Sequence, residues 1–182
     1  MRVIFFAMKA ENPFPVKVST GESVRISENL TICCTGMGSA GAVVFRRLLE
    51  ENPDFTELYE FGSAAAVENA ETGEIYECCS FFDGDGRLTA ESPKKTRFKT
   101  ASVTGDDDLF LGVKPAWTLG FDAPLLYTME SLRFKKTADE LGRDFTSIRL
   151  ATDSGEGDIR AAVRRSLELN RARVLTFFNS LK

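Results

Sequence analysis

The chain has 182 residues, 43% of them hydrophobic and 27% charged, and its 23 basic and 27 acidic side chains give a formal net charge of −4. This length predicts one globular domain over residues 1–182, large enough to bury its own core. The negative charge argues against nucleic acid and membrane surfaces as partners. The sequence has no histidine, which excludes Ser-His-Asp and Cys-His catalysis and histidine metal sites.

The cysteines form two adjacent pairs, Cys33-Cys34 and Cys78-Cys79, inside apolar runs. Because neighbours on a strand point to opposite faces, we expect buried, reduced thiols. The spacing matches neither a zinc site nor a redox dithiol. Residues 3–8 are the longest apolar run near the N-terminus and are too short for a signal peptide or a membrane span. We therefore expect a cytoplasmic protein.

The first elements in chain order are a strand, a hairpin and a helix. The continuously apolar residues 3–8 predict a strand buried on both faces of a parallel sheet. Residues 23–26 and 30–35 indicate a hairpin. A glycine-rich turn then leads into a helix over 39–51, with Ser39 as its N-cap.

The rest of the chain alternates between apolar strands and amphipathic helices. Helices are predicted over 131–141 and 158–181, where apolar residues recur at helical spacing. Strands alternating with helices favour a three-layer α/β fold. The further strands are predicted over 58–61, 75–82, 97–103, 125–128 and 145–150.

Ligands of open α/β sheets bind at the carboxyl ends of the strands, and these ends share a composition here. They combine small residues, which let the backbone approach a ligand, with separated carboxylates. Such carboxylates can supply a base, an acid and a hydroxyl acceptor, a set that suits hydrolysis of a glycosidic bond. The segments are 8–11, 35–38, 62–64, 104–106, 129–130 and 152–153.

Six short motifs follow one another over almost the whole chain: AMKAE (7–11), TGMGSAGA (35–42), FGSAAA (61–66), SVTGDD (102–107), YTMES (127–131) and IRLATDS (148–154). In this order they resemble the purine nucleoside phosphorylase superfamily, most closely the 5′-methylthioadenosine/S-adenosylhomocysteine nucleosidases. The resemblance implies a nucleoside-phosphorylase-like fold with a mixed central sheet flanked by helices. It also implies a homodimer that acts on a small-molecule nucleoside without metal or organic cofactor.

Carried over by position, the resemblance implies three catalytic residues. Glu11 would be the base that activates water, Asp153 the acid that protonates purine N7, and Arg149 a residue that helps to hold the water. The chemistry calls for the same types, because the sugar becomes oxocarbenium-like as the base departs. Two carboxylates with separated pKa values meet both needs.

The resemblance also implies a set of substrate-binding residues. Glu130 would receive the 2′ and 3′ hydroxyls of the ribose with Met129 beside it, and Ser63 would lie next to the ribose. Thr152 would lie beside Asp153, and Phe110 would replace the family's aromatic contact to the base. The full set is Met8, Ser63, Phe110, Met129, Glu130 and Thr152.

Each acidic candidate also has a structural reading. Glu11 could be a solvated loop residue, and Asp153 an ordinary turn or N-cap aspartate. Glu130 opens a helix, where the dipole alone favours an acid, and Met129 is by default core packing. The run at residues 106–108, three aspartates, reads as a solvated loop rather than a metal site.

Two charged residues near the predicted site affect which nucleophile the site can use. Arg149 lies inside an apolar strand, and a buried guanidinium needs a partner, for which Glu11 is the natural candidate. Glu60 stands two residues before Gly62, where phosphorylases of the superfamily typically have an arginine that grips phosphate. A carboxylate there would repel phosphate, which favours water as the nucleophile. The alternative is that Glu60 faces solvent and the site borrows a cation from Arg46 or Arg47.

These observations favour an N-glycosidase that hydrolyses an adenine-type nucleoside such as methylthioadenosine or S-adenosylhomocysteine. Three alternatives remain open. They are a futalosine-hydrolase-like enzyme, a nucleoside phosphorylase, and a nucleoside-binding protein that has lost turnover.

Overall fold

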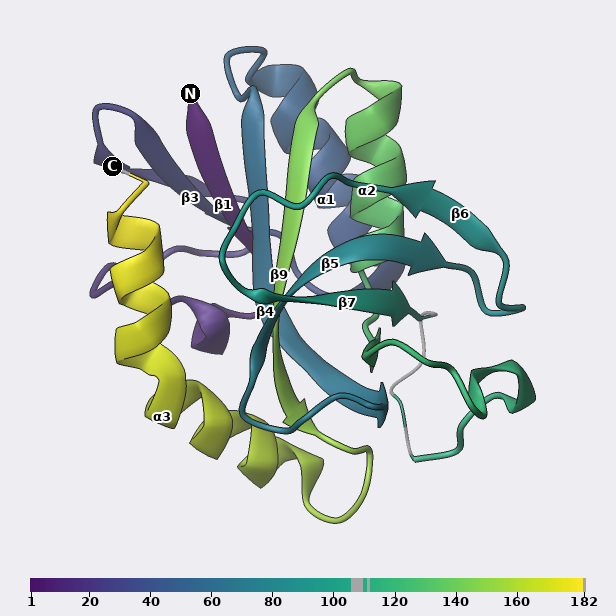
Figure 1. Cartoon of the computed structure of the whole chain (residues 1–182). Helices are drawn as coiled ribbons and strands as arrows, with labels where there is room; N and C mark the ends of the chain where they lie inside the picture. The colour runs from purple at the N-terminus through teal and green to yellow at the C-terminus, as the bar shows by residue number, and fades with distance from the viewer. Residues whose placement is uncertain (106–109, 111, 182) are drawn as a thin grey trace.

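The computed structural model describes residues 1–105, 110 and 112–181. Within them, a sheet of nine strands is flanked by three α-helices (Figure 1). The strands are β1 (Arg2–Phe6), β2 (Ser23–Ser27), β3 (Leu30–Cys34), β4 (Glu57–Glu68), β5 (Ile75–Phe82), β6 (Leu88–Glu91), β7 (Lys99–Thr104), β8 (Leu125–Tyr127) and β9 (Asp144–Asp153). The helices are α1 (Gly38–Glu51), α2 (Ser131–Glu140) and α3 (Ile159–Asn179), with 3₁₀ turns η1 (Lys9–Glu11) and η2 (Ala116–Thr118).

The sheet is mixed and partly closes on itself. β1 lies between β3 and β4 and is parallel to both, while β2 forms the predicted antiparallel hairpin with β3. β4 continues past β1 and pairs with β9 and β8. Because β8 pairs with β7, β7 with β5, and β5 with β9, these five strands form a closed ring. β6 adds an edge to β5.

The helices cover both faces of the sheet, which confirms the three-layer prediction. α1 and α2 lie together on one face, and α3, yellow in Figure 1, covers the other. β1 serves both layers: Phe5 packs with Phe45 of α1, and Phe6 packs with Phe178 of α3. This two-sided burial explains why the segment is continuously apolar. The described residues contain no helix long and apolar enough to cross a membrane.

The cysteines are buried or partly buried free thiols, as predicted. Cys33 belongs to the core on the α1 side and Cys34 to the core on the α3 side, as alternation along β3 requires. Burial raises the pKa of Cys33 and of Cys78 to about 12, so both thiols stay protonated at neutral pH.

Two strands are longer than predicted, and one strand was missed. β4 continues to Glu68 because its small residues 62–66 pair with β9 and β8, although their β propensity is low. β9 likewise continues to Asp153. The missed strand, β6, is a largely exposed edge without a hydrophobic pattern. Because β4 and β9 are longer than predicted, Ser63, Thr152 and Asp153 lie within strands rather than in the loops after them.

The prediction that Ser39 caps α1 is wrong, because the helix already begins at Gly38. Gly36 and Gly38 adopt φ of 87° and 59°, a conformation that glycine accepts at little cost. The amide of Gly38 donates to Oε1 of Glu130 at 3.0 Å. A carboxylate from the start of α2 therefore takes the place of a local cap.

Candidate active site

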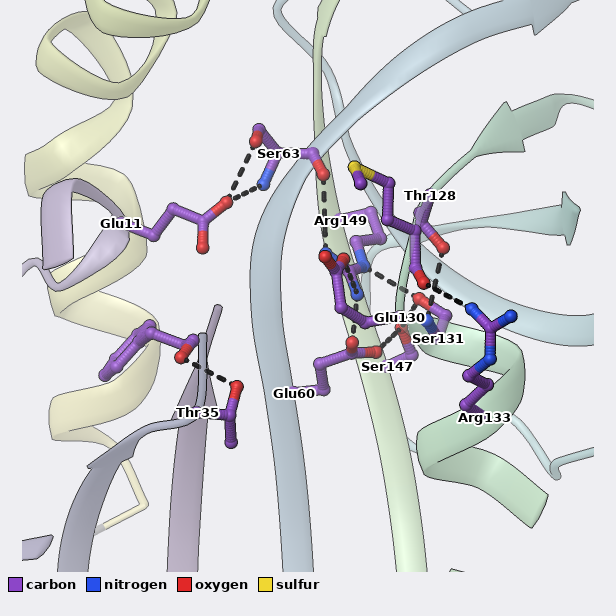
Figure 2. A network of polar contacts seen from close by, with 12 residues as sticks. Glu11, Thr35, Glu60, Ser63, Thr128, Glu130, Ser131, Arg133, Ser147 and Arg149 are labelled. Atoms are coloured by element: carbon purple, nitrogen blue, oxygen red, sulfur yellow. Dashed lines mark hydrogen bonds and ion pairs between the residues drawn. The ribbon is translucent and has the colours of Figure 1, made fainter. Parts of the chain in front are cut away.

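Glu11 lies in η1, directly after β1, with its carboxylate turned against β4 (Figure 2). The residue is only 3% exposed, so it is not the solvated loop residue of the alternative reading. One oxygen, Oε2, accepts from the Met8 amide at 2.9 Å. The other, Oε1, accepts from the amide and the hydroxyl of Ser63 at 2.7 and 2.8 Å. Three donors therefore fix the orientation of this carboxylate.

Burial raises the pKa of Glu11 above its ordinary value. The hydrogen bond from the Ser63 amide and the positive charge of Arg149 oppose this rise without cancelling it. A carboxylate with a raised pKa is a stronger base, provided that the pH stays above that pKa. Such a group is suited to take a proton from water.

Arg149 is buried on β9, opposite Gly62 of β4. Its Nε donates to the Ser131 hydroxyl at 2.9 Å and its Nη1 to the Ser63 carbonyl at 3.3 Å. The expectation that Glu11 is its partner is wrong. In the described part of the chain, its ion pairs are with Glu60 and, at 3.9 Å, with Glu130.

The reason for this pairing is the register of β4 and β9, which places Glu60 next to the guanidinium while Glu11 is already held by its own donors. Glu60 is 1% exposed, so the alternative in which it faces solvent is also wrong. Its Oε2 accepts from the Ser147 hydroxyl at 2.8 Å, and this hydroxyl lies 3.3 Å from that of Ser131. Burial raises the pKa of Glu60, and the charge of Arg149 opposes the rise.

Sequence reasoning missed Ser131 and Ser147 as partners in this network. It also misjudged Glu60, although a signal was available. Glu60 and Arg149 are opposite charges, each inside an otherwise apolar strand, and buried charges of this kind generally require one another.

Glu130 is the N-cap residue of α2 and is buried near Arg149. Its carboxylate reaches the N-terminus of α1, as described above, rather than only the dipole of its own helix. Met129 is partly buried, and its carbonyl accepts from Arg133 at 3.3 Å. A cavity of about 220 Å³ borders these residues, lined among others by Gly105, Thr128, Met129 and Glu130.

Asp153 ends β9 and is 8% exposed. Its Oδ1 accepts from the Gly155 amide at 2.9 Å, the turn contact of the structural reading. Its Oδ2 accepts from the Thr152 hydroxyl at 2.8 Å, and that hydroxyl also lies 3.3 Å from the Ala64 carbonyl. The N-cap of α3 is Asp158, so the N-cap reading of Asp153 is wrong.

Phe110 is buried beside the turn that follows Asp153. Its ring lies 5.2 Å from that of Tyr127, and a Cβ at Gly155 would come within 2.6 Å of its Cδ1. Phe110 therefore packs against the turn that holds Asp153. The aspartates at 106–108 lie outside the described residues.

Several of the predicted site residues lie along one stretch of β4, whereas Met129 lines the cavity beside Glu130 and Phe110 packs at the turn after Asp153. Ser63 contacts Glu11 through Oγ and the amide, and contacts Arg149 through its carbonyl. The next residue, Ala64, connects to Asp153 through the Thr152 hydroxyl. Two buried carboxylates in different environments thus flank adjacent residues of one strand, which is an arrangement capable of acid–base chemistry.

Comparison with known proteins gives structural matches only, since no family model and no curated protein matches the chain. A 5′-methylthioadenosine/S-adenosylhomocysteine nucleosidase from S. pneumoniae matches with a TM-score of 0.72 at 17% identity, over 96% of both chains. The Arabidopsis thaliana methylthioadenosine nucleosidase matches with 0.70 at 15% identity, over 98% of this chain and 95% of that one. Futalosine hydrolase of Helicobacter pylori matches with 0.73 at 12% identity, over 98% and 97%.

These likenesses span nearly the whole chain and establish the fold. The chain has the same three-layer fold as these nucleosidases and the futalosine hydrolase, which is the fold that the resemblance implied.

Proposed function

We propose that the protein hydrolyses the N-glycosidic bond of an adenine-type nucleoside of the methylthioadenosine or S-adenosylhomocysteine class. The observation that carries this proposal is the pair of buried carboxylates beside β4, Glu11 held by Ser63 and Asp153 held by Thr152 and the Gly155 amide. The fold shared with nucleosidases supports the same conclusion.

The reaction needs one proton removed and one delivered. Glu11 takes a proton from water while the water oxygen bonds to C1′ of the ribose. The bond from C1′ to N9 breaks, its electron pair stays with the purine, and Asp153 delivers its proton to N7. The products are the free base and the free sugar. Proton exchange with solvent then restores both carboxyl groups.

The remaining site residues position the substrate in this proposal. Arg149 holds the attacking water, and Glu130 accepts hydrogen bonds from the 2′ and 3′ hydroxyls. Oε1 of Glu130 accepts from the Gly38 amide. To bind the ribose hydroxyls, the Glu130 carboxylate rotates away from this amide. Met8, Ser63 and Met129 contact the sugar, Thr152 orients Asp153, and Phe110 stacks on the base.

The ion pairs of the site support water rather than phosphate as the nucleophile. Glu60 balances the charge of Arg149, so this guanidinium is not a free anion receptor. Arg46 pairs with Glu140, and Arg47 donates to the Gly21 carbonyl, so both are engaged at the surface. A phosphate would therefore enter a pocket whose nearest buried cation is already neutralised.

A futalosine-type nucleoside is the second candidate substrate. The futalosine hydrolase of Helicobacter pylori resembles the fold as well as the methylthioadenosine nucleosidases do. A panel of methylthioadenosine, S-adenosylhomocysteine, futalosine, adenosine and inosine, assayed for free base, separates these candidates. Tight binding without base release from any of them would instead identify a nucleoside-binding protein.

The roles of the two carboxylates are tested with Asp153→Asn and Glu11→Gln. Asp153→Asn should bind nucleoside but lose about 10²- to 10⁴-fold in turnover, because an amide cannot protonate N7. A substrate with an activated leaving group should partly rescue Asp153→Asn but not Glu11→Gln. Asp158→Asn, which keeps its α3 cap, serves as the matched control. Wild-type turnover in Asp153→Asn, or equal rescue of both variants, contradicts the assignment.

The resemblance also leads us to propose a homodimer in the cytoplasm. Light scattering on the purified chain measures the first property, and fractionation of cells that express it measures the second. A monomer over the assayed concentration range contradicts the dimer.

A further inference from the structure

Glu60 is a buried carboxylate to which the proposed reaction gives no direct role. We propose that Glu60 is a positioning residue that holds the Arg149 guanidinium in an ion pair and so keeps it from pairing with Glu11. The inference rests on the proposed function, in which Glu11 is that base. The proposed role of Glu60 depends on its ion pair with Arg149 and not on contact with the substrate.

The geometry places Arg149 between two carboxylates that compete for it. A Cβ built on Gly62 would lie 2.3 Å from Arg149 Nη1 and 3.0 Å from Glu11 Oε1, so both groups approach the same bare stretch of backbone. Arg149 nevertheless forms its close ion pair with Glu60, through Nη2. Figure 2 shows the Glu11 carboxylate at Ser63 and Arg149 turned toward Glu60.

The hydrogen bonds around Glu60 preserve this arrangement. Ser147 donates to the Glu60 oxygen that Arg149 leaves free, and Ser131 accepts from Nε of Arg149. Both oxygens of Glu60 are thereby engaged, and its ion pair is made by Nη2 of Arg149, whereas Nη1 is the atom that approaches Gly62. A neutral residue at position 60 would leave the full charge of Arg149 to act on Glu11 and Glu130.

The size of that effect is set by distance and burial. An opposite charge within about 4–6 Å lowers the pKa of a carboxyl group by about 1–3 units. Glu60 pairs with the guanidinium that lowers the pKa of Glu11, and in this proposal the pairing limits how strongly that charge acts on Glu11. Removing the charge from Glu60 should therefore make Glu11 a weaker base.

Other charged groups face Glu11 but are more exposed. On α3, Arg164, Glu168 and Arg171 line a cleft of about 190 Å³ that also borders Glu11. All three side chains are exposed, Arg171 donates to the Pro13 carbonyl, and solvent screens their charges. Lys9 of η1 is exposed as well. Glu130 is buried nearby, and its negative charge raises the pKa of Glu11.

The direct test is a ¹³C NMR titration of the Glu11 carboxyl group in protein labelled on glutamate, with the signal assigned by its loss in Glu11→Gln. In the wild type, Glu11 should titrate above 4.5, the ordinary value for glutamate. In Glu60→Gln its pKa should fall by about 1–2 units. Glu60→Asp, which keeps the charge, should retain a wild-type pKa.

The matched control is Glu57→Gln. It makes the same substitution on the same strand and also removes an ion pair with an arginine, Arg2, but far from Glu11 along β4. Glu11 should titrate as in the wild type in this variant. An equal fall in Glu57→Gln and Glu60→Gln would overturn the proposal, because the effect would then be a general consequence of lost charge.

Turnover supplies an independent readout. The acidic limb of kcat/KM against pH should move to lower pH by the same 1–2 units in Glu60→Gln, with a plateau roughly 3- to 10-fold lower, because a weaker base removes the proton of water less well. A folded Glu60→Gln with an unchanged Glu11 pKa overturns the role of Glu60. If that variant does not fold, a wild-type Glu11 that titrates at or below 4.5 overturns it equally.

The titration needs no substrate, so the two proposals fail separately. A shifted Glu11 pKa without base release from any nucleoside would overturn the proposed function. Base release with an unshifted pKa would overturn the role of Glu60 alone.

Discussion

Gly62 shows how closely the groups of the site approach one another. Its missing side chain leaves the space into which Arg149 and Glu11 both reach. The constraint is steric, because Gly62 is not among the glycines with positive φ. An added methyl group would therefore test the site without straining the backbone.

Gly62→Ala should lower kcat/KM by roughly 10- to 100-fold, since displacing a catalytic group by about 1 Å has costs of this order. Its circular dichroism spectrum should remain that of the wild type. Gly142→Ala, just after α2, is the control, because a Cβ there meets nothing within 4 Å and Gly142 lines neither cavity; its φ of 64° makes the alanine cost stability rather than activity. Steady-state kinetics on the best substrate decides the question. Equal kcat/KM in the two variants would mean that Gly62 does not border the reacting groups.

Glu11 should make stability depend on pH in a defined direction. Its folded-state pKa is raised, so its contribution to stability is fully present below the unfolded pKa and is lost as pH rises through the folded pKa. The variant Glu11→Gln has no ionisable group at this position, so its stability does not fall with pH in this way. The free energy of unfolding of the variant minus that of the wild type should grow above pH 4.5, by about 1.4 kcal/mol per unit of pKa shift. Urea denaturation across pH measures it, and a constant difference contradicts the raised pKa.

At the scale of elements, α2 positions Glu130 and is itself held by an aromatic contact. Phe134 of α2 stacks on Phe45 of α1 at 4.3 Å between ring centroids. This contact fixes the two helices against each other, and the Glu130 carboxylate spans between their N-termini. A change in the packing of α2 should therefore change the position of Glu130 in the site.

Phe134→Leu and Phe178→Leu should each reduce the free energy of unfolding by about 1–2 kcal/mol, less than the 3–5 kcal/mol typical of Phe→Ala. Only Phe134→Leu should also raise KM, because it loosens the helix that carries Glu130. Phe178 lies near the end of α3, in the opposite core. Denaturation and kinetics on both variants test this. A similar KM in the two variants would mean that the packing of α2 does not affect substrate binding.

An element can be predicted from the sequence when the pattern that specifies it lies within its own residues. β1 and the three helices could be predicted because burial imposes a pattern on their own residues. The ends of β4 and β9 could not, since residues 62–66 and 151–153 form strands only through their neighbours. Glu11, Ser63 and Glu130 were predicted as site residues through motifs, and their roles remain predictions. The pairing of Arg149 with Glu60 depends on register between strands, which no local pattern contains.

At the scale of the molecule, the site lies where two parts of the sheet meet. β1 pairs with β4 only as far as Phe6 opposite Phe61. The chain then turns through η1 and brings Glu11 back onto β4 at Ser63, where β4 enters the closed ring. Asp153 reaches the same place from β9 within that ring. The topology therefore joins residues near positions 11, 63 and 153 of the chain.

We propose that this site uses water, not phosphate, to cleave a nucleoside. The most direct measurement is base release from the best substrate of the panel, with and without millimolar phosphate, with the sugar product identified by mass spectrometry. We predict the free base and the free sugar, at a rate that phosphate does not change. A phosphate-dependent rate with a sugar 1-phosphate as product would show that phosphate, not water, is the nucleophile.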